Sequence, residues 1–206
     1  MLTKRPIKNI IHCRSIRQEG SPPLPSPPQE ISMPTFSGKR PSAIAYRLAP
    51  PRCIDSLVRN IMSLAQMFDP TDTGCYVVVW RGIEEDDSIM WSPAVGVAVG
   101  KVAPEKMAKY ARLAQEKAER LAANPEHIAS FQTRDETDPA NPKYPGAVRM
   151  DLDHIIISCS GFDWKFDEMV GIEIGLFLRL ISVERVRDLM ALSSNEHAER
   201  RYAKHN

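Results

Sequence analysis

Long apolar runs are missing from this sequence of 206 residues. A membrane-spanning helix needs about 18 consecutive apolar residues, and the nearest candidate, 170–183, is interrupted by Glu173 and Arg179. The first residues also lack the apolar stretch of a secretory signal. We therefore expect no membrane span and an intracellular protein, located in the cytoplasm or in mitochondria.

Cysteine and histidine are scarce, with four and five residues respectively. The cysteines stand at positions 13, 53, 75 and 159, so no two have the CxxC spacing of a zinc or redox motif. The scattered histidines add no zinc-binding pattern. These absences predict reduced thiols rather than a disulfide framework, and no metal site.

An excess of one charge is also missing, because 27 basic residues face 26 acidic ones and the net charge is +1. A protein that wraps a polyanion presents a surplus of basic residues. We therefore expect no nucleic-acid partner. Apolar residues make up 43% of the chain, which is enough for one substantial core.

Proline is abundant but unevenly placed, since ten of the 17 prolines fall at or before Pro51. The run SPPLPSPPQE at 21–30 excludes helix and central strand, because proline lacks an N–H and has a fixed φ. We therefore assign 1–50 to a basic, proline-rich, extended tail. It is either a disordered linker or an arm that docks on a protein partner.

The first 18 residues of this tail carry five basic side chains and no acid before Glu19. A basic, acid-free and weakly amphipathic segment is typical of a mitochondrial transit peptide. Pro6 speaks against a continuous helix there. An ordinary basic tail without a targeting role is the alternative.

Hydrophobic periodicity predicts one α+β domain over 51–192, followed by a charged C-terminal tail, 193–206, that we expect to fray. Two pairs of strands, with helices before, between and after them, indicate an antiparallel sheet of about five strands with helices packed on it. The segment 81–88 reads as a turn and 124–146 as a long loop. Helices are predicted at 51–68, 104–123, 165–182 and 183–192, and strands at 75–80, at 89–100 (bent near Pro93 and Gly96), and in two segments from 147 to 160.

The helix predicted at 104–123 is amphipathic, with an apolar stripe that includes Ala114, Ala118 and Leu121. Its other face is charged, and Glu116 and Arg120 are spaced for an i, i+4 ion pair. We interpret this charged face as a solvated surface.

The segment DHIIISCSGFDWKFDE, 153–168, contains the strongest candidates for chemistry. Cys159 could be a nucleophile at a strand-to-helix turn, but the apolar run around it favours burial in the core. Ser160 lacks the GxSxG context of a hydrolase, so a capping role is expected. His154 is either a haem or metal ligand or a histidine bonded at the strand end. Asp167 and Glu168 suit the first turn of a helix, where negative charge is stabilised.

The same segment carries a family resemblance. A glycine-opened hairpin at Gly146 leads to the apolar strand HIIISC, then Ser160-Gly161, five residues, and Asp167-Glu168 at a helix start. Together with Lys117-Ala118 in the preceding helix, this pattern resembles the GlcG/HbpS-like proteins, also described as haem-degrading or PduO C-terminal-like, over about residues 57–178. The resemblance implies a profilin-like fold, haem or small-molecule binding, and assembly into a homo-oligomer.

The chain departs from the family pattern at glycines that let a ligand approach the backbone. Ile155 and Ser158 stand where the family strand has glycines, and Pro145 replaces the first glycine of its Gly-Gly-x-Pro opening. We expect any pocket to lie between the 104–123 helix and the segment 146–168, and we assign no catalytic residue. The candidate ligand-binding residues are Lys117, His154, Ser160, Gly161, Asp167 and Glu168.

Three functions follow as alternatives. The first is a non-catalytic, oligomeric GlcG/HbpS-like protein that binds a small molecule, with haem as the cofactor that the resemblance suggests. The second is an interaction subunit of a larger assembly, anchored by the proline-rich arm at 1–50. The third is an enzyme that acts on a small organic acid.

Overall fold

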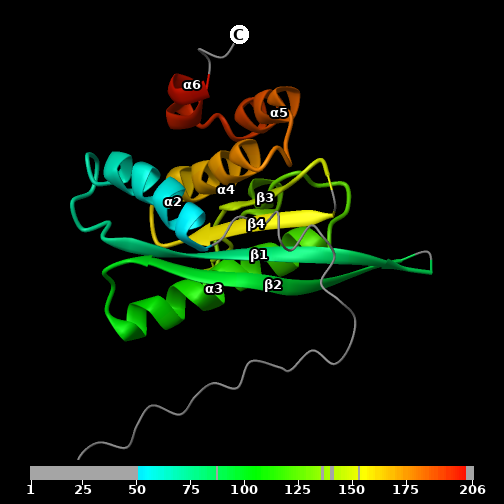
Figure 1. Ribbon diagram of the computed structural model, residues 1–206, viewed down its shortest axis with the longest axis horizontal. Helices are drawn as coiled ribbons and strands as arrows, with labels where there is room; N and C mark the ends of the chain where they lie inside the picture. Colours follow the sequence, from blue (N-terminus) through cyan, green and yellow to red (C-terminus); the bar gives the residue numbers. More distant parts are fainter. Residues whose placement is uncertain (1–50, 87, 136, 140–141, 153, 203–206) are drawn as a thin grey trace, which may run out of the picture. The chain divides into compact units, whose positions relative to one another are not determined.

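The computed structural model describes residues 51–202, except positions 87, 136, 140, 141 and 153 (Figure 1). The expectations for the basic, proline-rich tail at 1–50 therefore lie outside the described residues. Within the described part, no helix is long and apolar enough to cross a membrane.

Four strands form one antiparallel sheet with the order β2-β1-β4-β3. Strand β1 (Gly74–Glu85) and strand β2 (Ser88–Gly100) make a long hairpin, and the shorter β4 (Ile155–Ser160) and β3 (Ala147–Arg149) complete the sheet. The pairing of β1 with β2 shifts register between Val79 and Trp80, opposite Pro93. Proline cannot donate to a strand ladder, so its place on an outer strand at an irregularity is the expected one.

Helices cover both faces of the sheet, giving three layers (Figure 1). Helix α3 (Pro104–Ala122) packs on one face against β1 and β4, while α2 (Pro51–Ala65) and α4 (Trp164–Phe177) pack on the other. Alternation along β1 matches this division. Val77 and Val79 join the core beneath α2 and α4, and Val78 joins the smaller core beneath α3.

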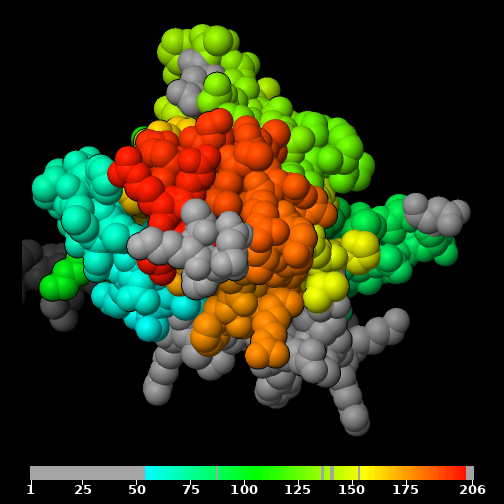
Figure 2. Space-filling view, turned by 90° about the horizontal axis from the view of Figure 1, so that it is seen from above, coloured from blue at the N-terminus to red at the C-terminus, as the bar shows by residue number. Residues whose placement is uncertain are grey.

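Two short helices lie beyond α4. Helix α5 (Val183–Ser193) and helix α6 (Glu196–Tyr202) cover the outer side of α4 (Figure 2). Ala198 and Tyr202 of α6 are buried, and the Tyr202 hydroxyl donates to Glu173 Oε2 at 2.8 Å. The expectation that the charged C-terminal tail frays is therefore wrong for residues 196–202.

The α+β class and the order of the main elements agree with the sequence-based prediction, but three details differ. The described sheet has four strands rather than about five. Strand β1 continues to Glu85, so the turn predicted at 81–88 is confined to the positions between β1 and β2. The predicted loop 124–146 contains a 3₁₀ turn, η1 (Ser130–Thr133).

Candidate functional site

A buried ion pair joins the two helical layers at the end of β4. Lys117 Nζ on α3 lies 2.8 Å from Asp167 Oδ2 on α4, and both side chains are 2% exposed. The same ammonium donates to the carbonyl of Cys159 at 2.9 Å, and Asp167 Oδ1 accepts the Phe162 N–H at 3.1 Å. Burial raises the pKa of the Asp167 carboxyl, while Lys117 and the Phe162 amide act in the opposite direction.

Gly146 makes room for this pair. Its φ is +130°, and a Cβ built at this position would lie 2.9 Å from Lys117 Nζ and 2.8 Å from Asp167 Cβ. Its carbonyl accepts the Cys159 N–H at 3.0 Å, so the chain before β3 continues the sheet beside β4. The glycine that opens the predicted hairpin is thus explained by close packing around the ion pair.

Gly161 has an equally specific place. Its φ is +144°, and a Cβ there would lie 2.6 Å from the Cα of Cys75 on β1. This glycine lets the chain leave β4 directly above β1 and begin α4. Asp163 then caps the helix by accepting the Lys165 N–H at 3.0 Å. The capping role expected for Ser160 therefore belongs to Asp163.

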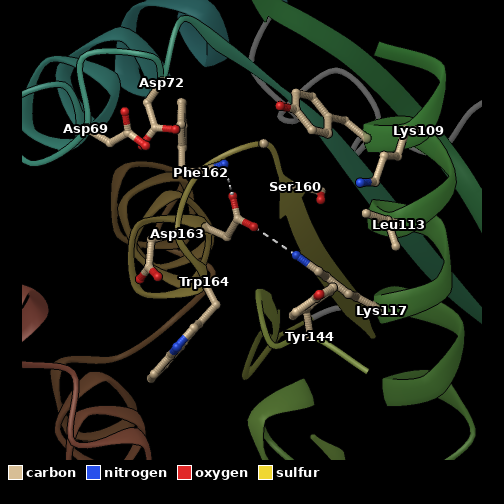
Figure 3. Close-up of a pocket in the computed structure, with 13 residues that line it drawn as sticks. Asp69, Asp72, Lys109, Leu113, Lys117, Tyr144, Ser160, Phe162, Asp163 and Trp164 are labelled. Atoms are coloured by element: carbon tan, nitrogen blue, oxygen red, sulfur yellow. Dashed lines mark hydrogen bonds and ion pairs between the residues drawn. The ribbon is translucent and has the colours of Figure 1, made fainter. Parts of the chain in front are cut away.

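A pocket of about 580 Å³ opens above the ion pair (Figure 3). It lies between α3, the turn from β4 into α4 and the loop before β1. Polar and apolar surface contribute about equally to the pocket wall, and its bottom is formed by the Lys117–Asp167 pair. It is lined by Asp69, Asp72, Lys109, Tyr110, Leu113, Lys117, Tyr144, Ser160, Gly161, Phe162, Asp163, Trp164 and Asp167.

Several polar side chains of the pocket lack a protein partner among the described residues, and Asp72, Lys109 and Ser160 are three of them. No cation lies within ion-pair distance of Asp72, and no carboxylate lies within that distance of Lys109. Ser160 is only 4% exposed, yet no hydrogen bond of its hydroxyl is formed with the described residues. These groups are therefore available to a bound molecule.

The acidic residues on one side of the pocket raise the pKa values of neighbouring groups. Burial, followed by repulsion from Asp69, Asp167 and Asp163, raises the pKa of Asp72 to about 6. Burial and the charge of Asp72 likewise raise the pKa of Tyr110. A cationic group bound beside Asp72 would relieve this repulsion.

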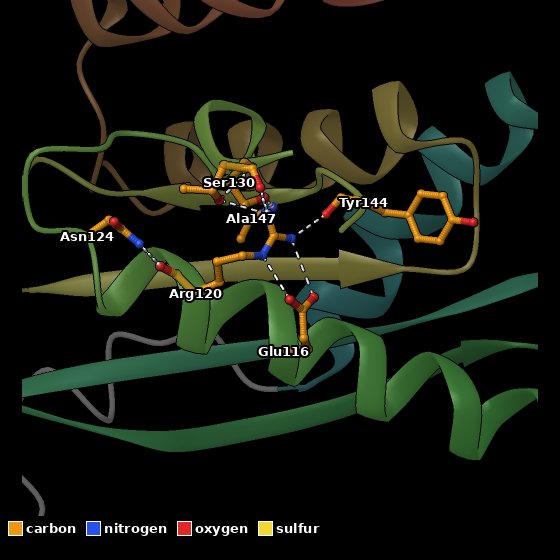
Figure 4. Close-up of polar contacts among 7 residues, drawn as sticks. Glu116, Arg120, Asn124, Ser130, Tyr144 and Ala147 are labelled. Carbon is orange, nitrogen blue, oxygen red and sulfur yellow. Dashed lines mark hydrogen bonds and ion pairs between the residues drawn. The ribbon is translucent and has the colours of Figure 1, made fainter. Parts of the chain in front are cut away.

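Arg120 holds the loop that supplies Tyr144 to the pocket wall (Figure 4). Its guanidinium pairs with Glu116 at 2.8 Å, as the i, i+4 spacing predicts. It also donates to the carbonyls of Ser130 (3.1 Å), Thr133 (2.9 Å) and Tyr144 (2.7 Å). Arg120 therefore belongs to a half-buried network, and its assignment to a solvated face is wrong.

The structure brings together four of the six candidate ligand-binding residues predicted from the sequence. Lys117, Ser160, Gly161 and Asp167 line the pocket. His154 precedes the first residue of β4, at the other end of this strand, with a φ of +46°, and its Nε2 lies 2.8 Å from Glu84 Oε1.

Glu168, the sixth candidate, belongs to a different environment. It is buried between α4 and the junction of α5 with α6, where its Oε1 accepts from Ser193 Oγ (2.8 Å) and Asn195 Nδ2 (3.2 Å). Its Oε2 has no hydrogen-bond partner among the described residues. Burial raises the pKa of Glu168 to about 7, because two neutral donors compensate the charged form only in part.

Cys159 lies in the core, as the apolar run around it predicts. Its side chain is fully buried beside Cys75, and burial raises the pKa of its thiol well above the ordinary value. A thiol of this kind is a poor nucleophile, since the thiolate is the reactive form. Both cysteines are free.

Several residues that line the pocket were not predicted from the sequence. Asp69 and Asp72 lie in the loop between α2 and β1, and nothing in their local pattern distinguishes them from surface acids. For Lys109 and Tyr110 a signal existed, because they lie about two turns before Lys117 on the same helix. Asp163 carried the ordinary signature of a helix cap.

Metal binding finds no support in the described residues, where no group of three or more histidine, cysteine or acidic side chains could hold an ion. Comparisons with protein-family models, curated proteins and solved structures find no match to this chain. The resemblance to GlcG/HbpS-like proteins therefore stays a prediction.

Proposed function

We propose that the protein is a non-catalytic binding protein for a small polar molecule, which it holds in the pocket between α3 and the turn from β4 into α4. The observation that carries this proposal is a pocket with polar groups that the described residues leave unpaired, above a buried ion pair that fixes its bottom. A volume of about 580 Å³ falls in the ordinary range of small-molecule sites.

The α+β architecture is compatible with the profilin-like fold of GlcG/HbpS-like proteins, and we retain that family as part of the proposal. The haem version is weaker. No histidine, methionine or cysteine is among the residues that line the pocket, and His154 lies beyond the other end of β4. Tyrosine can ligate haem iron, so Tyr110 and Tyr144 are the residues that a haem titration would test.

The test is ligand screening by protein NMR, with the pocket filled in a variant. Leu113→Trp places a larger side chain in the wall, and Leu152→Trp, at an exposed position away from the pocket, is the matched control. We expect at least one small polar compound to shift resonances of residues 109–117 and 160–167 in the wild type and in L152W but not in L113W. Equal shifts in all three proteins, or no shifts from a broad library, would contradict the proposal.

A second candidate, a self-associating interaction subunit, is favoured by the hairpin of β1 and β2. The hairpin projects beyond the helices (Figure 2), and near its tip Ile83, Ile89 and Met90 are 51%, 37% and 58% exposed. Among the described residues no strand pairs with the outer edge of β2. An apolar strand with an open edge can pair with a second copy of the chain.

Sedimentation velocity tests this second candidate. We expect the full chain to form a dimer or larger species and Met90→Lys to weaken it, whereas Met67→Lys, at another exposed methionine, does not. A monomeric wild type would contradict self-association. Deletion of 1–50 examines the predicted docking arm separately: loss of a co-purifying protein partner would support the arm, and retention would exclude it.

A further inference from the structure

The unpaired groups in the pocket carry opposite charges and lie apart. Asp72 and Lys109 enter from different elements, on opposite sides of the pocket (Figure 3). No ion pair joins them, although each is without an oppositely charged partner among the described residues. Lys117 and Asp167 neutralise each other and are already hydrogen-bonded. The pocket therefore offers Lys109 as a free cationic position and Asp72 as an anionic position without any partner among the described residues, beside Asp69 and Asp163, which only accept neutral hydrogen bonds.

A ligand with a single charge satisfies only one of these positions. A simple anion beside Lys109 would leave Asp72 unpaired and would meet repulsion from Asp69 and Asp163, which line the same pocket. A simple cation beside Asp72 would leave Lys109 unpaired. The first arrangement leaves the half-buried Asp72 without compensation for its desolvation, and the second forgoes the attraction of Lys109, which is exposed.

Ser160 supplies the neutral contact. Its side chain is more than nine-tenths buried, its hydroxyl has no partner among the described residues, and it belongs to the pocket wall. A hydroxyl can donate to a carboxylate or accept from an ammonium group. A ligand that reaches this hydroxyl gains a hydrogen bond in addition to the two ion pairs.

We propose that the ligand is a small zwitterion, with an ammonium group held by Asp72, a carboxylate held by Lys109, and a hydrogen bond to Ser160. This inference deepens the proposed function and rests on it. A free amino acid or a short amino-carboxylic acid has this chemistry. The spacing of its two charges is a property that the experiment determines.

The test is calorimetric titration of the full chain with a series of zwitterions of increasing length: glycine, β-alanine, 4-aminobutanoate and 6-aminohexanoate, with several α-amino acids. Each is compared with its matched carboxylic acid and its matched amine. We expect at least one zwitterion to bind about tenfold or more tightly than both matched compounds. Equal binding of the zwitterion and one of its singly charged analogues would overturn the inference.

Charge-removing variants identify which end of the ligand meets which residue. Asp72→Asn is expected to lower the affinity for the zwitterion about tenfold without lowering the affinity for the carboxylic acid. Lys109→Met is expected to lower the affinity for the zwitterion about tenfold without lowering the affinity for the amine. Ser160→Ala is expected to weaken the zwitterion several-fold. Glu105→Gln and Lys106→Met, exposed positions of α3 outside the pocket lining, are matched controls and should change nothing.

The two proposals fail in different ways. If neutral polar compounds bind in the NMR screen and L113W abolishes their binding, but no zwitterion exceeds its analogues, the ligand class is wrong and the binding function stands. If a zwitterion binds equally well to L113W and to the wild type, it binds elsewhere and both proposals are wrong. If D72N weakens the carboxylic acid as much as the zwitterion, Asp72 does not hold an ammonium group and the assignment is overturned.

Discussion

Lys117 and Asp167 form an ion pair of 2.8 Å between helices on opposite faces of the sheet, with both side chains 2% exposed. The contact is possible because Gly146, directly before β3, has no side chain to fill the space beside the end of β4. The pair closes the bottom of the pocket, ties α3 to α4 and holds the carbonyl of Cys159. It is both a structural and a site-forming contact.

Removing one partner of this pair should destabilise the protein strongly. Lys117→Met leaves Asp167 buried without its cation, and Asp167→Asn leaves Lys117 without its anion, so each is expected to cost about 3–5 kcal/mol. The double variant K117M/D167N should cost clearly less than the sum, because neither unpaired charge remains. Urea unfolding of the four proteins measures this coupling. Additive losses would show that the pair contributes nothing specific.

Gly146→Ala should be destabilising for two reasons. The residue has a φ of +130°, a region that alanine rarely adopts, and the added Cβ would lie within 3 Å of both Lys117 Nζ and Asp167 Cβ. We expect a loss of about 2 kcal/mol or more in urea unfolding. Alanine at Gly171, whose Cβ would have its nearest contact at 3.1 Å with a side chain and whose φ is not positive, should cost less. The reverse order would contradict the argument.

Glu168 should make stability fall as the pH rises. Its pKa is raised from 4.5 to about 7 by burial, so the folded state favours the protonated form. The corresponding stability is fully present below about pH 4.5 and is lost as the pH rises through about 7. At about 1.4 kcal/mol for each pH unit, the change amounts to about 3 kcal/mol.

The Glu168→Gln variant isolates this contribution. Glutamine keeps an oxygen for the donors Ser193 and Asn195 but cannot ionise, so the variant should be less sensitive to pH than the wild type between pH 5 and 8. At pH 8 it should unfold at a higher urea concentration. Glu199→Gln, at an exposed position of α6, is the control. If the stability of all three proteins depends on pH in the same way, groups other than Glu168 cause the effect.

The α+β class could be predicted from the sequence because helices and strands are recognised from local patterns of apolar and turn residues. Periodicity located α3, and alternation with turn residues located the main strands. The C-terminal helix α6 was missed because its sequence is charged and short. Its stability comes from tertiary contacts of Ala198 and Tyr202 that periodicity over seven residues does not reveal.

The site was predictable only in part. Lys117 lies three residues after the buried Ala114 and four before Leu121, a spacing that places it next to the apolar stripe of α3, but the sequence-based prediction named it only as a candidate ligand-binding residue. The sequence does not show whether Asp167 or Glu168, both near the start of α4, pairs with Lys117. The two acids are neighbours in the chain, but their side chains point to different environments. Asp72 could not be predicted as a pocket residue, because its loop between α2 and β1 is far from Lys117 in the sequence and meets the pocket only in the folded chain.

Arg120 should stabilise the loop between α3 and β3 and, through Tyr144, the position of the pocket wall. Lysine in its place keeps the charge but not the planar fork that reaches Glu116 and the carbonyls of Thr133 and Tyr144 together. We expect Arg120→Lys to cost about 1–3 kcal/mol and to speed hydrogen exchange in residues 130–144 at least tenfold. Arg112→Lys, at an exposed position on the same helix, should leave both unchanged.

The same variant separates folding from binding, because Tyr144 lines the pocket while Arg120 does not. If the network positions the pocket wall, R120K should bind any ligand of the pocket several-fold more weakly under conditions where it remains fully folded. The change should be seen in affinity and in the exchange of Tyr144, with little change in the resonances of Asp69 and Asp72 on the other side. Unchanged affinity together with faster exchange would limit Arg120 to a stabilising role and would remove Tyr144 from the binding surface.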